Sequence, residues 1–194
     1  MTVTLLRATD RTATRWKNGG GITREIAAAP PGAGMDDFAW RVSLAEVKDD
    51  GPFSAFPGVT RTLTVAEGAG MELTVDGVRR TVGERFRPQD FAGDARTHGR
   101  LLDGPVVNFN VMYRPGLTEA LTAVVRGRLT VSIPPGGTVL VVALDGTAVI
   151  EGAGAELGPH DAALLTGESP GVLRADGRTA VVTFSPAPDG APCP

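Results

Sequence analysis

The sequence predicts an all-β protein with antiparallel strands, and three observations lead to this fold class. Twenty-six glycines and fifteen prolines divide the 194 residues into short runs of Val, Leu, Ile and Thr, a composition typical of strands. Asp-Gly and Glu-Gly pairs fall between several of these runs, where they favour tight hairpin turns. A faint internal repeat, RFRPQDFAG at 85–93 and LGPHDAALLTG at 157–167, indicates two similar β-barrel halves.

The expected strands follow one another along the chain as ITREIAA, RTLTVAEG, MELTVDGVRRTVG, VVNFNVMYRPG, LTVSIPPGGTVLVVALDGTAVIEG and TAVVTFSPAP. Hairpin turns are expected at four pairs, Asp76-Gly77, Asp145-Gly146, Glu151-Gly152 and Asp176-Gly177. Residues 117–125, LTEALTAVV, are the one candidate for a turn or two of helix, in the connection between the halves. Residues 27–37 and the terminal APDGAPCP are expected to form a surface loop and a loose tail.

Length, charge and cysteine content exclude several functional classes. The 42% hydrophobic content is enough to bury a sizeable core. The net charge is −3 and Lys and Arg form no run, so neither nucleic acid nor an anionic membrane is an expected partner. The single cysteine, Cys193, leaves no intramolecular disulfide or multi-cysteine zinc site. No stretch approaches the roughly 20 apolar residues of a membrane span, and a cytoplasmic protein is expected.

The densest run of chemical groups is WKNGGGITREI, residues 16–26. A phosphate loop needs glycines followed by Lys and then Ser or Thr at the start of a helix, but here Lys17 precedes the glycines and a strand-like alternation follows. In that strand Thr23 and Glu25 share one face. The glycines are therefore expected to allow a sharp bend or a close backbone approach, with Lys17 and Asn18 at the rim of a pocket. A bulge with exposed neighbours is the alternative.

Several motifs occur together in one order, namely WKNGGGITREI, FAWRVSLAEVKDDGPFSAFPGVTRTLTV, FAGD and LLDGPVVNFNVMYR. On these motifs the chain closely resembles the HutD/Ves family. The resemblance implies a two-lobed, cupin-like β-barrel (bicupin), with residues 1–115 as the first lobe and 116–194 as the second lobe and C-terminal tail, packed as one compact unit. It also implies an association with histidine utilisation, in which family members have been proposed to sense an intermediate such as N-formylglutamate. Ves-type relatives have no settled activity.

Cupins are often metal enzymes, so the positions of the metal ligands need to be compared. When the metal-binding cupin motif is aligned with this sequence, two of its glycines match Gly51 and Gly70. Its metal-ligand positions, however, fall on Pro57, Val59 and Leu63. None of these three side chains can bind a divalent ion. The only histidines are His98 and His160, whereas catalytic zinc or iron usually has three protein ligands. No metal and no cofactor is therefore expected, and His98 is expected in a loop, bonded to a neighbour or in a pocket wall.

A metal-free barrel can bind a small molecule through polar side chains that project into its interior. The predicted ligand-binding residues are Lys17, Asn18, Thr23, Glu25, Arg41, Ser43, Arg61, Asn108 and Asn110. Arginine forks suit carboxylates, and Asn, Ser and Thr supply neutral donors and acceptors, so the set suits a small anionic metabolite that carries an amide. The alternative is a structural ion-pair network of Arg41, Arg61 and Glu25 that closes the barrel. Trp16, Phe53 and Phe56 are expected in the core.

The sequence favours a metabolite-binding regulator or sensor over an enzyme, because Cys193 lies in the tail and the histidines have no assignable nucleophile. The enzyme alternative is a metal-independent isomerase or hydrolase with Glu25 as general base and Arg41 and Arg61 as oxyanion partners. Where family members commonly carry Asp, this chain has Asn108, which weakens a role for a carboxylate there. A third reading is a structural interaction module, such as a homodimer formed through an exposed sheet edge.

Overall fold

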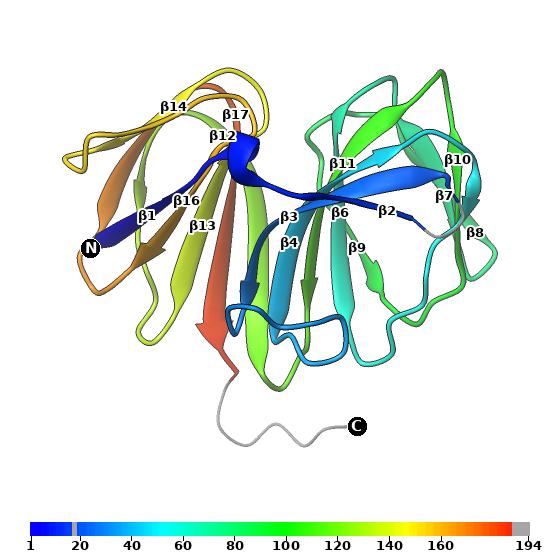
Figure 1. Ribbon diagram of the computed structural model, residues 1–194, viewed down its shortest axis with the longest axis horizontal. Helices are drawn as coiled ribbons and strands as arrows, with labels where there is room; N and C mark the ends of the chain where they lie inside the picture. The colour runs from blue at the N-terminus through cyan, green and yellow to red at the C-terminus, as the bar shows by residue number, and fades with distance from the viewer. Residues whose placement is uncertain (17–18, 188–194) are drawn as a thin grey trace. The chain divides into compact units, whose positions relative to one another are not determined.

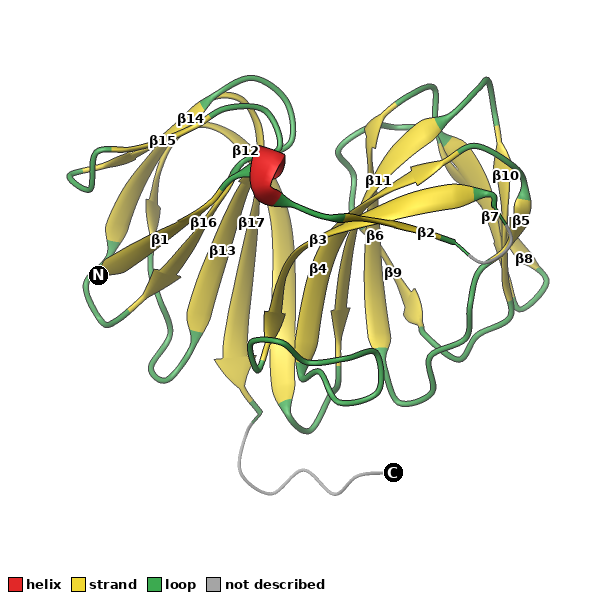
Figure 2. Ribbon diagram, in the orientation of Figure 1, coloured by secondary structure: helices red, strands yellow, loops and turns green. Residues whose placement is uncertain are grey.

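The computed structural model describes residues 1–16 and 19–187, and over these residues the chain is almost entirely β-structure (Figures 1 and 2). The one helical element there is the 3-10 turn η1 (Ala8–Asp10). All strand pairs are antiparallel, which confirms the predicted fold class. No helix in the described part of the chain is long and apolar enough to cross a membrane.

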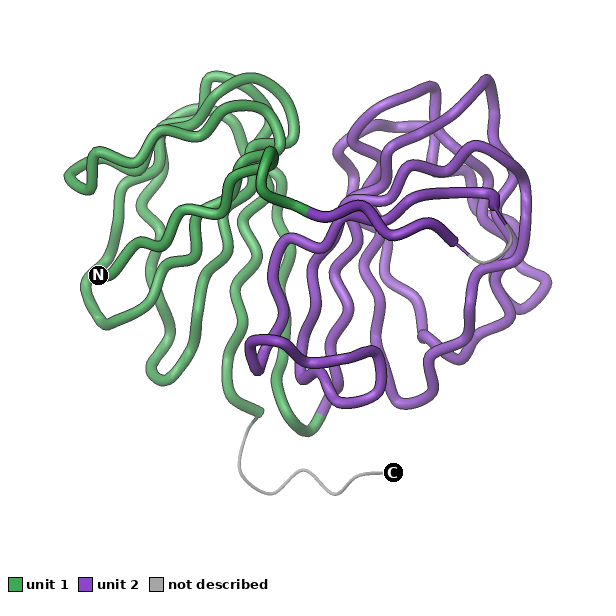
Figure 3. The backbone as a smooth tube through the Cα atoms, in the orientation of Figure 1, with its two compact units in different colours: residues 1–11, 116–194 green, residues 12–115 purple. Residues whose placement is uncertain are grey.

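The chain divides into two compact units (Figure 3). Unit 2 is residues 12–115, and unit 1 combines Met1–Arg11 with the chain from Gly116 onward. The sequence-based division assigned residues 1–11 to the first lobe, and the structure differs there. The reason is strand pairing, because β1 (Thr2–Leu6) is hydrogen-bonded along its length to β16 (Ala162–Thr166).

Unit 2 is built from two antiparallel sheets. The six-stranded sheet has the order β2-β3-β4-β11-β6-β9, and the four-stranded sheet has the order β5-β10-β7-β8. The strands of the first sheet are β2 (Ala13–Arg15), β3 (Gly21–Ala29), β4 (Trp40–Val47), β6 (Thr60–Glu67), β9 (Gln89–Ala92) and β11 (Val106–Tyr113). Those of the second are β5 (Gly51–Pro52), β7 (Met71–Val75), β8 (Val78–Val82) and β10 (Thr97–Leu101).

The interior of unit 2 is formed by one face of each sheet. Leu63, Val65 and Phe91 of the six-stranded sheet pack with Met71 and Leu73 of the four-stranded sheet in a single apolar cluster. Because side chains alternate along a strand, this cluster identifies which face of every strand in the six-stranded sheet points inward. That assignment locates the candidate site below.

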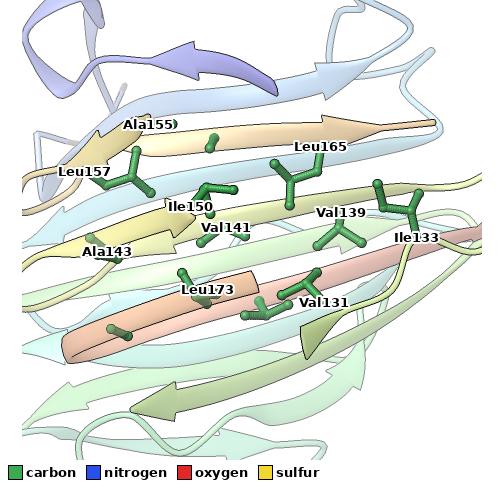
Figure 4. Close-up of a cluster of buried hydrophobic side chains, with 14 residues drawn as sticks. Val131, Ile133, Val139, Val141, Ala143, Ile150, Ala155, Leu157, Leu165 and Leu173 are labelled. Carbon is green, nitrogen blue, oxygen red and sulfur yellow. The ribbon is translucent and has the colours of Figure 1, made fainter. Parts of the chain in front are cut away.

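Unit 1 is one seven-stranded sheet of order β1-β16-β13-β17-β14-β15, with β12 paired to β17. Its remaining strands are β12 (Thr118–Val131), β13 (Thr138–Ala143), β14 (Ala148–Glu151), β15 (Ala155–Leu157) and β17 (Gly171–Pro186). Its core consists of Val, Leu, Ile and Ala side chains, among them Val139, Val141, Leu165 and Leu173 (Figure 4).

Two of the four predicted hairpin turns are present. Asp76 and Gly77 have φ of 48° and 81° and join β7 directly to β8, as expected for a two-residue turn with left-handed backbone. Glu151 and Gly152 lie at the turn between the paired strands β14 and β15. The other two predictions were wrong. The chain passes Asp145-Gly146 from β13 to β14, each of which pairs with β17, and Asp176-Gly177 lies inside β17.

The expected helical turn at 117–125 is also wrong, because these residues enter strand β12. Leu121 and Val124 have the spacing of a helix face, but the segment pairs residue by residue with β17, from Thr118 opposite Pro186 to Val125 opposite Thr179. The hydrogen bonds of a long ladder outweigh a weak local preference for helix.

Candidate functional site in the interior of unit 2

Seven of the predicted site residues lie on the inward face of the six-stranded sheet. Cross-strand partners project to the same side of a sheet, so the register places side chains directly. Thr23, Ala45, Asn108 and Val65 form one row across β3, β4, β11 and β6. The next rows are Glu25, Ser43, Asn110 and Leu63, and then Arg41, Met112, Arg61 and Phe91. Since Leu63, Val65 and Phe91 belong to the core of unit 2, this face points to its interior; six of the seven polar residues are buried or half-buried there, and Glu25 lies on the same face but is exposed.

Arg61 is a buried guanidinium surrounded by aromatic rings. The residue is 7% exposed, and its Cζ lies 5.2 Å from the ring centre of Phe53, 5.5 Å from that of Phe56 and 5.1 Å from that of Phe91. Rings attract a cation through their negative faces. Burial nevertheless lowers the pKa of Arg61 to about 10, which leaves the side chain cationic at neutral pH.

The hydrogen bonds of Arg61 are long and incomplete. Nη1 donates to the backbone oxygen of Ser54 at 3.3 Å, and Nη2 donates to Oδ1 of Asn110 at 3.4 Å. Nε is buried and has no partner. No carboxylate among residues 1–16 and 19–187 forms an ion pair with this side chain. A buried cation without a counter-ion is costly, so the geometry favours an anion from outside the chain.

Asn108 presents a second unsatisfied group on the same face. The residue is 1% exposed, its Nδ2 lies 3.4 Å from the sulfur of Met71, and its Oδ1 has no hydrogen-bond partner. Thioether sulfur is a weak acceptor. The interior therefore holds a neutral amide with unused hydrogen-bonding capacity two residues along β11 from Asn110.

Glu25 and Arg41 form an ion pair with each other. Arg41 Nε donates to Glu25 Oε2 at 2.6 Å, and the side chains are 14% and 43% exposed, respectively. The ion-pair alternative therefore holds for this pair and fails for Arg61. Because Arg41 is occupied by Glu25, Arg61 is the arginine of the predicted set that lacks a carboxylate partner in the described chain.

The glycine-rich stretch closes the turn from β2 to β3. Gly19 has φ of 77°, and a Cβ on Gly21 would lie 2.6 Å from the oxygen of Glu46 and 2.9 Å from the Trp16 ring. These values match both uses expected for the glycines, a sharp bend and a close approach. Trp16 Nε1 donates to Thr23 Oγ1 at 2.8 Å. Lys17 and Asn18, predicted at the pocket rim, lie outside the described residues, as do Cys193 and the tail from residue 188.

A small pocket lies beside this turn. It has a volume of about 20 Å³, and its lining includes Trp16, Val47, Asp50, Phe53 and Gly99. This space suits about one water-sized group. Phe53 lines this pocket and also contacts Arg61, which makes it the residue common to the surface opening and the buried cation.

The residues present do not fit a metal ion. Within the described ranges, no three His, Cys, Asp or Glu side chains lie close enough to hold one. Val59 and Leu63, which occupy two ligand positions of the cupin frame, are buried in apolar clusters. His98 lies on strand β10 with its side chain exposed, and its inward neighbours are Thr97 and Gly99, so the expectation of a loop or pocket-wall position was wrong.

The sequence missed the aromatic surroundings of Arg61. Phe53 and Phe56 were expected in the core, and both do pack against apolar clusters, but they also contact the guanidinium. Phe91 was not singled out. The signal that points to them is the spacing FSAFPGVTR, residues 53–61, although only the β6–β9 register brings Phe91 opposite Arg61.

Comparison with known proteins places this chain in a family. The HutD family model matches residues 8–183. An uncharacterised 21.2 kDa protein in the hutC 3′ region of Pseudomonas putida is 42% identical over 111 residues, which is 57% of this chain and 58% of that protein. Protein Ves of Citrobacter koseri is 37% identical over 130 residues, 66% of each chain. The chain thus spans less than two thirds of the length of these curated relatives.

Solved structures agree over a longer span. HutD from Pseudomonas fluorescens SBW25 has a TM-score of 0.84 at 34% identity, covering 96% of this chain and all of that one. A conserved protein of unknown function from Pseudomonas aeruginosa PAO1 has a TM-score of 0.82 at 32% identity, with coverage of 97% and 100%. A bacterial pirin from Escherichia coli shares the fold alone, with a TM-score of 0.69 at 13% identity over 96% and 100% of the chains. By the match to its family model, this chain belongs to the HutD family.

Proposed function

We propose that the protein binds a small carboxylate metabolite inside unit 2, with Arg61 as the group that holds the carboxylate, and that it acts as a regulator or sensor of histidine utilisation. The observation that carries the proposal is the buried guanidinium with an unpaired Nε and no carboxylate partner. A carboxylate would accept short charge-assisted hydrogen bonds from the planar fork. These bonds would replace the long contacts to Ser54 and Asn110.

The chemistry of the interior narrows the ligand class. Arg41 is already paired with Glu25, so the interior supports one carboxylate held deeply rather than two. The neighbouring rows supply neutral groups, Ser43, Asn108 and Asn110, which suit the amide of an acylated amino acid. N-formylglutamate would place one of its two carboxylates on Arg61 and its amide near Asn108, and its second carboxylate would lie outside this deep position.

The histidine-utilisation assignment rests on relatives. The Pseudomonas putida relative is described by its place in the hutC 3′ region, and HutD of Pseudomonas fluorescens is structurally similar along nearly the whole chain. Both support the association with histidine utilisation that the sequence motifs imply. The proposal for this chain is therefore a metal-independent binding protein in that process.

The experiment is a calorimetric titration of the metal-stripped protein with histidine-pathway acids, among them N-formylglutamate, glutamate and urocanate, together with formate as the smallest carboxylate. Binding of one acid is expected in the parent, and Arg61→Ala is expected to abolish it. Arg87→Ala is the matched control, because the Arg87 side chain is 69% exposed and forms a surface ion pair with Glu84. Absence of saturable binding by every acid, or equal affinity in Arg61→Ala, would refute the proposal.

A further inference from the structure

One irregular segment supplies most of the cover over Arg61. Residues 53–58, FSAFPG, connect β5 of one sheet to β6 of the other. The segment contributes the rings of Phe53 and Phe56 and the backbone oxygen of Ser54, which are three of the five contacts of the guanidinium. The other two contacts, from Phe91 and Asn110, come from strands of the six-stranded sheet.

This cover is attached lightly compared with the strands beneath it. Within the described chain, its backbone is anchored by four hydrogen bonds besides the one from Arg61. Phe53 N–H donates to the oxygen of Thr97 at 2.9 Å and Phe56 N–H to the oxygen of Gly93 at 2.8 Å. Val59 N–H donates to the oxygen of Phe56 at 3.2 Å, and Arg114 Nη1 donates to the oxygen of Pro57 at 3.3 Å. Both phenyl rings are half-buried, and Ser54, Ala55, Pro57 and Gly58 are exposed. Segments with few buried apolar contacts and exposed backbone open at low free-energy cost.

Phe53 lies between the surface pocket and the buried cation. Its ring occupies space left by Gly99, where a Cβ would lie 2.9 Å from Phe53 Cε1. The same ring lines the pocket beside Trp16 and approaches Arg61 at 5.2 Å. The Phe53 ring is therefore shared by the pocket lining and the surroundings of the guanidinium.

We propose that residues 53–58 form a movable cover over Arg61, and that the Phe53 ring determines which molecules reach the guanidinium. The reason is geometric. Arg61 is 7% exposed, so an anion cannot meet its fork while Phe53, Ser54 and Phe56 of the cover contact the guanidinium. The identity of the ligand that passes the cover rests on the proposed function, whereas the opening of the cover is a property of the chain itself.

The test labels arginines with phenylglyoxal, which reacts with accessible guanidinium groups, and measures each site by peptide mass spectrometry. In the parent, Arg61 is expected to react much more slowly than the exposed Arg87. Phe53→Ala is expected to accelerate labelling of Arg61 about tenfold, equivalent to about 1.4 kcal/mol of easier opening. Phe86→Ala is the matched control, because Phe86 stacks on Arg85 in another loop of the same unit, and it is expected to leave the Arg61 rate unchanged.

Two labelling results would overturn the cover. One is labelling of Arg61 in the parent at the rate of Arg87, and the other is an unchanged Arg61 rate in Phe53→Ala. Phe53→Leu, which keeps an apolar side chain, is measured in parallel in case the alanine variant does not fold, and it is expected to give a smaller acceleration. In the parent, amide exchange at Phe53 and Phe56 is expected to be faster than in β6 and β11, and equally slow exchange would also overturn the cover.

The two proposals fail in different ways. Slow labelling that Phe53→Ala accelerates, in a protein that binds no carboxylate, supports the cover and refutes the proposed function. Carboxylate binding with an Arg61 rate that does not respond to Phe53→Ala supports the proposed function and refutes the cover. The labelling readout needs no ligand, which makes this separation possible.

Discussion

Replacing Arg61 by Met is expected to leave the unliganded protein at least as stable as the parent, although Arg61 lies in the interior of unit 2. Burial lowers the pKa of the guanidinium from its ordinary value to about 10. At about 1.36 kcal/mol per pKa unit, folding therefore disfavours the charged form by about 3 kcal/mol. Because folding lowers the pKa of a base, this cost is fully present below about pH 10 and is relieved only as the pH rises above that value, so it acts in full at pH 7.

The contacts of Arg61 offset much of this cost. Three ring contacts return about 0.5–1 kcal/mol each, and the two hydrogen bonds, at 3.3 and 3.4 Å, are long. Methionine retains an unbranched apolar stem that adapts to irregular space and contacts aromatic rings well. The expected net change is about 0–1 kcal/mol in favour of the variant, or roughly 0–4 °C in melting temperature for a protein of this size.

The assay combines urea unfolding at pH 7 with thermal unfolding in the presence of the carboxylate found by titration. At a ligand concentration of about 100 times Kd, the parent is expected to gain about 2.7 kcal/mol, roughly 5–10 °C. Arg61→Met is expected to show no gain, and Arg87→Met to respond like the parent. A decrease of more than about 2 kcal/mol in the free energy of unfolding of unliganded Arg61→Met would refute the reasoning. A buried cation without its anion is not expected to stabilise the fold more than an apolar side chain at the same position.

Two further predictions concern stability. Gly177→Ala is expected to destabilise unit 1 by more than about 3 kcal/mol, because its Cβ would lie 1.8 Å from the backbone oxygen of Asp145. Gly51→Ala is the control and is expected to be nearly neutral, because no atom lies within 4 Å of its Cβ. Equal urea midpoints for the two variants would contradict this prediction. Asp161→Asn is expected to cost about 1–3 kcal/mol at pH 7. Burial raises the pKa of Asp161, but hydrogen bonds from Ala8, Arg7 and Gly158 outweigh it and lower the pKa below 3.8. Its contribution is therefore full above about pH 4 and fades as the pH falls below that, so unfolding curves at pH 7 and pH 3 should differ, and an equal cost at both would exclude the ionic origin.

The sequence determined the class of the fold because its signals are local. The short β-branched runs and the Asp76-Gly77 turn need no distant partner to be interpreted, and both appear in the structure. Signals that depend on pairing were misread. Asp176-Gly177 has the same composition as a hairpin turn, yet it lies within β17, where Gly177 makes room for Asp145. The first eleven residues belong to unit 1 because β1 pairs with β16. This pairing joins segments that are far apart in the sequence, so no local signal predicts it.

The same division applies to the candidate site. Alternation along each strand determined that Thr23 and Glu25, Arg41 and Ser43, and Asn108 and Asn110 project together in pairs, since side chains in a strand repeat every two residues. Which arginine would have a partner could not be read from that pattern.

Tertiary structure decided the roles of the two arginines. The register of β3 against β4 brings Glu25 to Arg41, whereas Arg61 lies opposite Phe91 and beneath a segment from the other sheet. Burial, pairing and desolvation depend on neighbours that are distant in the sequence. The chain by itself therefore specified the polar residues on the inward face of the barrel, and only the packing of two sheets left one of its cations unpaired.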